Sequence, residues 1–239
     1  MKTKTLAALA GLCIAAPALA QTTYTGYAGG SPTAPGVAIP DNTTAGVSIT
    51  ISSTLGTAIT DMVFTLQFGT GTTAGNREHS WIGDLVVTLA YTPTLGGPIA
   101  PVAILDRVGV SPNSTFGNSA DMNGFYNFAD AGSTLVTGAA GNINAAGSTV
   151  GGNIVSTVFT PDAVQANAYT AFVGTAQINN ALAAFNTAYG TGTWTVFITD
   201  RAGGDTGDII SASVTLIPTP GAAALLGLGG LAAARRRRA

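Results

Sequence analysis

Alternating apolar and polar residues run along much of the chain and predict β-strands. The clearest run covers 193–199, where apolar residues that begin with Trp194 alternate with threonines. A second run over 210–216 starts at Ile210 and alternates Ile, Ala, Val and Leu with serine and threonine. A period of two is that of a strand with one buried face. We therefore expect two half-buried strands here, joined by an acidic turn.

Other segments repeat this pattern. Segments 47–52 and 59–68 alternate in the same way, while 85–91 is apolar on both faces and is expected at the centre of a sheet. Helical spacing is found only within 163–189. Many strands separated by glycine-rich turns, with at most one or two helices, favour an all-β antiparallel sandwich.

The N-terminal region is typical of an exported protein. Lys2 and Lys4 precede an apolar run that ends in the small-residue site Ala18-Leu19-Ala20, which predicts a secretory signal peptide over 1–20. The one cysteine, Cys13, lies in that peptide, so the mature domain would carry no disulfide. Residues 21–38 are rich in Gly, Thr, Ser and Pro and are expected to form a flexible lead-in.

The C-terminal segment 218–239 has three parts. Pro218-Thr219-Pro220-Gly221 precedes thirteen apolar residues and the cluster Arg235–Arg238. As a helix the apolar run would rise roughly 20 Å, short of the roughly 30 Å of a hydrocarbon core, so we expect transient membrane association rather than a permanent anchor. This layout resembles the PEP-CTERM sorting signal of Gram-negative bacteria, with Thr219 where that motif has Glu. The resemblance implies processing by an exosortase-like sorting enzyme.

Charge excludes several classes of partner. Between 21 and 218 there are eleven acidic and three basic residues, a formal net charge of −8, and no lysine. Such a surface is unsuited to nucleic acid or anionic membranes and favours cations.

Acidic residues gather in the turn after the strand at 193–199. Asp200, Asp205 and Asp208 are separated by glycines, which allow the backbone to bring carboxylates together. Asp84 stands beside another predicted strand, and Asp41 lies in an earlier turn. Oxygen ligands in flexible turns suit calcium, so these five are candidate calcium ligands, with Asp121 and Asp130 as further candidates. The alternative is that these aspartates only cap turns in a solvated loop.

Other chemistry finds little support in the sequence. His79 is the one histidine, so a Ser-His-Asp triad depends on a residue that we expect to form a structural hydrogen bond. A zinc site lacks its usual ligands, and no glycine-rich loop has the strand-to-helix context of a nucleotide site. A carboxylate pair for a glycosidase stays a weak alternative. Trp81 and Trp194 are expected in the core rather than on a ligand platform.

Several motifs occur in one order along the chain. They are Ile39-Pro40-Asp41-Asn42, the 48–52 strand, His79-Ser80-Trp81-Ile82-Gly83-Asp84-Leu85, Ile104-Leu105-Asp106-Arg107-Val108-Gly109, Phe128-Ala129-Asp130-Ala131, Leu182–Asn186, Gly192-Thr193-Trp194, and Ala202-Gly203-Gly204-Asp205-Thr206-Gly207. Together they resemble the P domain (P/Homo B domain) that follows the catalytic domain of subtilisin-like proprotein convertases. The resemblance covers 39–217, apart from insertions around 131–152 and 163–181. It implies a jelly-roll β-sandwich of about eight antiparallel strands, which is not catalytic in that family.

Three hypotheses of function follow. The first is an exported, non-catalytic module at the cell surface or in the extracellular matrix of a Gram-negative bacterium. It would bind polysaccharide or protein, with calcium holding its loops. The second is an accessory role with a separate subtilisin-like serine endopeptidase. The third and weakest is an autonomous hydrolase.

Overall fold

The structure is a computed structural model that describes residues 21–107, 117, 119, 121–130, 141–142, 158–160 and 181–219. Within these residues it contains ten strands and two short 3-10 helices. The strands are β1 (Thr22–Tyr27), β2 (Val37–Ala38), β3 (Val47–Phe68), β4 (Leu85–Pro93), β5 (Ile99–Asp106), β6 (Gly124–Ala129), β7 (Gly141–Asn142), β8 (Val158–Thr160), β9 (Tyr189–Asp200) and β10 (Asp208–Pro218). The 3-10 helices are η1 (Ile82–Asp84) and η2 (Ala181–Phe185).

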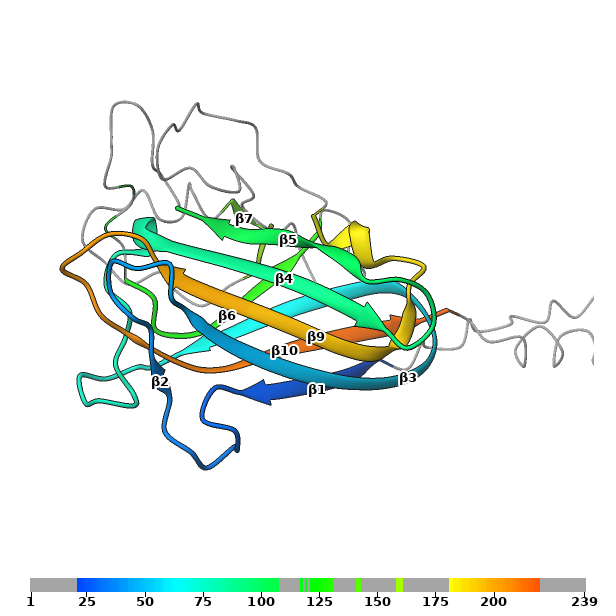
Figure 1. The fold of residues 1–239 in the computed structure, drawn as a ribbon, viewed down its shortest axis with the longest axis horizontal. Helices are drawn as coiled ribbons and strands as arrows, with labels where there is room; N and C mark the ends of the chain where they lie inside the picture. The colour runs from blue at the N-terminus through cyan, green and yellow to red at the C-terminus, as the bar shows by residue number, and fades with distance from the viewer. Residues whose placement is uncertain are drawn as a thin grey trace, which may run out of the picture.

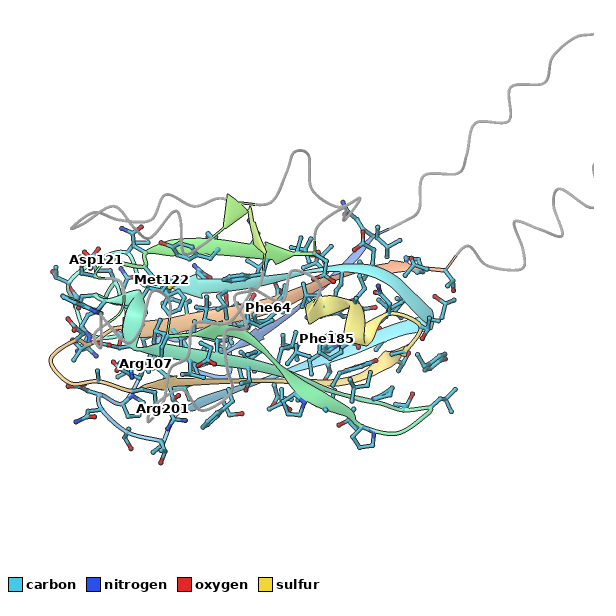
Figure 2. The ribbon with its side chains drawn as sticks, turned by 90° about the horizontal axis from the view of Figure 1, so that it is seen from above. Phe64, Arg107, Asp121, Met122, Phe185 and Arg201 are labelled. Carbon is cyan, nitrogen blue, oxygen red and sulfur yellow. The ribbon has the colours of Figure 1, made fainter. Side chains whose placement is uncertain are left out.

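The strands form two layers. Sheet I has the order β5-β4-β9-β3, and sheet II has the order β10-β3-β6-β8-β7, with β1 and β2 also paired to β10. Figure 1 shows β4, β9 and the first half of β3 side by side in the nearer layer, and Figure 2 sees the two layers edge-on. Eight of the ten described strands form antiparallel pairs, whereas β7 and β8 pair in parallel. The predicted all-β sandwich with about eight antiparallel strands is confirmed.

The long strand β3 belongs to both sheets. Its first half, from Val47 to Thr54, pairs with β9 in sheet I, and its second half, from Ile59, pairs with β10 and β6 in sheet II. The register shifts between Thr54 and Ala58, where the strand bends from one layer into the other. Two alternating segments that the sequence presents separately are therefore one continuous strand.

The core fills the space between the sheets. Apolar side chains of alternate positions point inward, and their largest fully buried members include Trp194, Tyr91 and Phe64. Trp194 stacks on Tyr91 with ring centroids 3.9 Å apart, and its indole N–H donates to Ser53 Oγ at 3.1 Å. A buried Trp usually needs such a polar partner. The prediction that Trp194 belongs to the core is confirmed, whereas Trp81 is only half-buried and has a φ of 66°.

Strands β9 and β10 do not form a hairpin. β9 lies in sheet I between β4 and β3, and β10 lies in sheet II between β1 and β3, so residues 201–207 cross from one layer to the other. The alternation expected for β10 also fails at its start. A bulge between Ile209 and Ser211 leaves Ile209 buried and Ile210 partly exposed.

Two further expectations need correction. The lead-in 21–38 contains β1, which pairs with β10 along its whole length, and the two residues of β2. Polar composition suggested flexibility there, but the edge of sheet II supplies backbone partners for β1. The described part of the predicted helical segment is the 3-10 helix η2, and Tyr189 already begins β9.

Some predicted segments lie outside the described residues. These are the signal peptide 1–20, most of the insertions around 131–152 and 163–181, and the sorting segment beyond Thr219. Among the residues that are described, no helix is both long and apolar enough to span a membrane.

Candidate functional site

One end of the sandwich brings together four of the five predicted aspartates. We call it the acidic end, defined by Asp41, Asp84, Asp200 and Asp205. Leu85 pairs with Asp200 across β4 and β9, so Asp84 and Asp200 lie beside each other at the strand ends. The Arg201 amide donates to the Asp84 carbonyl at 2.8 Å, which ties the 201–207 loop to η1. In Figure 2 the labelled residues Arg107 and Arg201 lie toward this end, away from Phe185.

Asp84 is the most unusual carboxylate of the acidic end. The residue is 2% exposed, and its Oδ1 accepts no hydrogen bond, although Arg107 Nη2 lies 3.8 Å from it. Burial, and after it the negative charge of Asp200, raises the pKa of Asp84 from its ordinary 3.8 to about 7, and Arg107 only partly offsets this. A buried anion beside other anions is destabilising unless a cation compensates it.

Asp200 is bound to the single histidine. His79 Nε2 donates to Asp200 Oδ2 at 3.2 Å, and the Ala202 amide donates to Asp200 Oδ1 at 3.1 Å. The His79 ring packs edge-on against Phe68, and the whole residue is 0% exposed. His79 thus has the expected structural hydrogen bond and fixes the end of β9 against the 69–80 loop.

Asp205 and Asp41 hold loops together. Ser80 Oγ donates to Asp205 Oδ1 at 2.9 Å, and the Gly204 amide donates to Asp41 Oδ2 at 3.2 Å. Within the described residues, each of these carboxylates accepts a hydrogen bond through one oxygen, which leaves the other oxygen for a further ligand. Asp41 is exposed and Asp205 is half-exposed, in contrast to Asp84.

Asp208 has a separate structural role. Its Oδ2 accepts from the amides of Gly75 and Arg77, and the Arg77 guanidinium donates to both oxygens, with Nη2 2.8 Å from Oδ1. Burial raises the pKa of Asp208, but these donors outweigh that effect and lower it below its ordinary value. Because its oxygens are already used, we omit Asp208 from the proposed calcium ligands.

The two further candidates, Asp121 and Asp130, are not among the acidic neighbours of Asp84. Asp130 Oδ1 accepts from the Leu182 amide of η2 at 3.1 Å, and burial raises the pKa of its carboxyl. Asp121 precedes Met122, which is bridged to His79. Asp130 therefore supports the backbone of η2.

Sequence reasoning missed Arg107. Its φ of 52° is in the left-handed region, and this turn directs its Nε to the Gly83 carbonyl at 3.3 Å, under η1. This placement makes Arg107 the cation nearest to Asp84. An isolated arginine after a strand carries no local signal of that position.

No group of three or more His, Cys, Asp or Glu side chains stands ready to hold a metal in the part of the chain that is described. A shallow cavity of about 180 Å³ lies beside the acidic end, lined by Asn42, Thr43, Thr44 and Arg201. The Thr43 amide donates to the Asp200 carbonyl at 2.9 Å, so this cavity and the carboxylates share one loop.

Comparisons with known proteins give one distant likeness. No family model matches the chain, and no curated protein matches it. Among solved structures, it is similar to the crystal structure of the complex of Aeromonas sobria serine protease (ASP) and the chaperone (ORF2), with 15% sequence identity and a TM-score of 0.38. The match covers 84% of this chain and spans 27% of the length of that one. A likeness of this size carries no conclusion about function.

Proposed function

We propose that this chain is an exported, non-catalytic β-sandwich module of the P/Homo B type, which binds extracellular polysaccharide or protein and uses calcium to hold its acidic end. The observation that carries the proposal is Asp84, a buried carboxylate with an unbonded Oδ1 and three acidic neighbours. Carboxylates held this close without a matching set of cations favour a bound divalent ion.

A structural role for His79 supports a non-catalytic module. A general base must reach its substrate within hydrogen-bonding distance. His79 is fully buried between Phe68 and Asp200, and Gly207 packs directly against it. Its hydrogen bond joins elements of the fold instead.

The residues of the acidic end fit calcium by donor chemistry. Asp41, Asp84 and Asp205 offer hard oxygen donors, whereas both oxygens of Asp200 already take part in hydrogen bonds. Backbone carbonyls of the same loops are of the kind that complete calcium sites. Asp84 Oδ1 and the unengaged oxygens of Asp41 and Asp205 are the donors that we assign. Because no three carboxylates are already grouped around one point among the described residues, binding requires the loops of Asp41 and Asp205 to adjust.

The test is a thermal melt of the purified protein with excess calcium and with a chelator. We expect calcium to raise Tm by several degrees, as mass action predicts for a ligand that binds only the folded state. Asp84→Asn should abolish that rise. The matched control is Asp208→Asn, which should lower Tm in both conditions but keep the calcium-dependent rise. An unchanged Tm for the wild-type protein with calcium would refute the calcium site.

Export and sorting complete the proposal. The signal peptide and the PEP-CTERM-like segment would place the module at the cell surface or in the matrix after transient membrane association and processing by an exosortase-like enzyme. The alternative partner, a subtilisin-like serine endopeptidase, rests on the resemblance to the convertase P domain. The material that co-purifies with the chain from the cell envelope distinguishes the two hypotheses. The accessory role predicts a protease, and the binding role predicts matrix material.

A further inference from the structure

The outward surface of sheet I carries a regular array of hydroxyl groups. We call it the hydroxyl face, and its members are Ser48, Thr50, Ser52, Thr92, Thr193 and Thr195. All six residues are exposed. They occupy three strands that lie side by side toward the viewer in Figure 1, namely β4, β9 and the first half of β3.

Strand register places these hydroxyls in rows. Thr193 is opposite Ser52 on one side and Thr92 on the other, and Thr195 is opposite Thr50. Ideal sheet geometry separates successive rows by about 6.8 Å and neighbouring strands by about 4.8 Å. The next row has Phe197 at its centre, opposite Ser48, and this ring is 38% exposed.

The hydroxyls of this face are not used by the fold. None of the six makes a hydrogen bond within the described part of the chain. On the outside of sheet II, by contrast, polar side chains bond one another across strands: Thr23 with Thr215 at 2.8 Å, Thr65 with Asn127 at 2.7 Å and Ser211 with Gln67 at 2.8 Å. The two faces have similar composition, so the difference lies in how their side chains are engaged.

Charge limits what can cover the hydroxyl face. The strand segments that form it contain no charged residue between Val47 and Ala58, between Leu85 and Pro93, or between Tyr189 and Thr199. A charged partner would lose hydration there without gaining an ion pair. Among the described residues, Phe197 is the one large exposed apolar side chain on this face, too little for the aromatic-rich centre of a protein interface.

We propose that the hydroxyl face binds a neutral, β-linked polysaccharide, with Phe197 as the ring on which one sugar stacks. Each serine or threonine hydroxyl both donates and accepts, which suits the hydroxyls of a sugar. An extended glycan matches an extended row of strands, and the apolar face of a sugar ring can pack on an exposed aromatic side chain. This inference rests on the proposed binding function and names its ligand class and surface.

The cavity beside the acidic end extends the same surface. Arg201, which lines it, lies four residues beyond Phe197 and donates from Nε to Thr199 Oγ1 at 2.9 Å. Arg77 and Arg107 are engaged with Asp208 and Asp84, whereas Arg201 makes no ion pair within the described residues. Its guanidinium and the Asn42, Thr43 and Thr44 side chains provide further donors for sugar hydroxyls at one end of the face.

The test measures retention of the purified protein on microcrystalline cellulose, chitin and an insoluble mixed-linkage β-glucan, with calcium alginate beads as the acidic arm. We expect retention on at least one neutral glycan, unchanged between roughly 0.05 and 0.5 M NaCl because no charge pairs are involved. Phe197→Ala should weaken binding about threefold to tenfold. The double variant Thr193→Val/Thr195→Val keeps the β-branched shape and should weaken it comparably.

The matched control is Phe125→Ala, because Phe125 is 52% exposed on β6 of sheet II. It should bind as the wild-type protein does. Equal binding by wild type, Phe197→Ala and the double valine variant would overturn the proposal, as would retention only on alginate. Far-UV circular dichroism confirms that each variant is folded.

Matrix isolated from the producing cells separates failure of this inference from failure of the proposed function. Retention of wild type and Phe197→Ala on matrix to the same extent would reject the hydroxyl face and leave the binding module standing. Loss of matrix retention by Phe197→Ala, together with the neutral-glycan result, supports both. No retention of wild type on matrix or on any glycan rejects both.

Discussion

Two buried aspartates of this chain have opposite surroundings. Asp208 is held by an arginine and two backbone amides, which lower its pKa, whereas Asp84 faces other carboxylates and has its pKa raised to about 7. The first stabilises the fold when it is ionised. The second destabilises the fold when it is ionised, because Arg107 offsets its burial and its acidic neighbours only in part. The same residue type therefore stabilises the fold at Asp208 and is a candidate metal ligand at Asp84.

Asp84 predicts an unusual dependence of stability on pH when calcium is removed by a chelator. Its pKa in the folded state, about 7, is above its ordinary 3.8, so between these values the folded state binds more protons than the unfolded state. The stability that protonated Asp84 contributes is fully present below pH 4 and is lost as the pH rises toward 7. Relative to Asp84→Asn, the free energy of unfolding of the wild-type protein should fall by on the order of 2–4 kcal/mol over that range.

Urea unfolding of both proteins at several pH values measures this difference. Asp84→Asn is the reference for the wild-type protein, because asparagine keeps the shape of aspartate and cannot ionise. Parallel pH profiles for the two proteins would contradict the raised pKa. Saturating calcium should flatten the wild-type profile, since the ion favours the ionised carboxylate.

The sequence predicts Asp41, Asp84, Asp200 and Asp205 as ligands because strand ends and glycine turns are visible locally, and the structure gathers all four at one end of the sandwich. Calcium binding by them stays a prediction. The pairing of Asp208 with Arg77, 131 residues away, had no local signal. Such a pairing depends on the tertiary fold. Arg107 was missed for the same reason.

Among the elements, the loop 201–207 depends on a close approach of backbones. A Cβ at Gly207 would lie 2.4 Å from His79 Cα, a distance that requires one of the two segments to move. His79 is fixed by Asp200 and Phe68, so it cannot move without breaking buried contacts.

Gly207→Ala should therefore destabilise the fold by roughly 1–3 kcal/mol. The matched control is Gly97→Ala, because an added Cβ there meets nothing within 4 Å. Chemical denaturation of both variants provides the comparison. A Gly207→Ala protein as stable as Gly97→Ala would show that the two segments are not held against each other.

Element type was more predictable than element partners. Period-two alternation correctly identified the strand at 193–199, and the run at 85–91, apolar on both faces, was correctly expected in the interior of a sheet. It gave no information on the β10 bulge, which turns Ile210 outward, or on the edge that orders β1. Those features depend on which backbone groups lie opposite, and that is set by the neighbouring strands of sheet II.

The whole molecule is held together by β3. Since its first half pairs with β9 in sheet I and its second half lies between β10 and β6 in sheet II, neither layer can open without disturbing the other. We expect a single cooperative unfolding transition, as for small domains with one core.

Fluorescence of Trp194 in a Trp81→Phe variant reports on the core beside sheet I, and far-UV circular dichroism reports on all strands. Their denaturation curves should coincide. Two separated midpoints would show that the layers unfold independently.

The same strand also determines when folding can finish. The main partners of β3 are β9 and β10, at the far end of the described chain, so its first half, from Val47, waits for residues near Ile198 before it can pair. Contacts so distant in sequence carry a large loop-closure cost and slow the folding of β proteins. During synthesis, β3 is made early and its pairing is completed last. Its apolar positions then need protection from other chains until 189–218 has emerged.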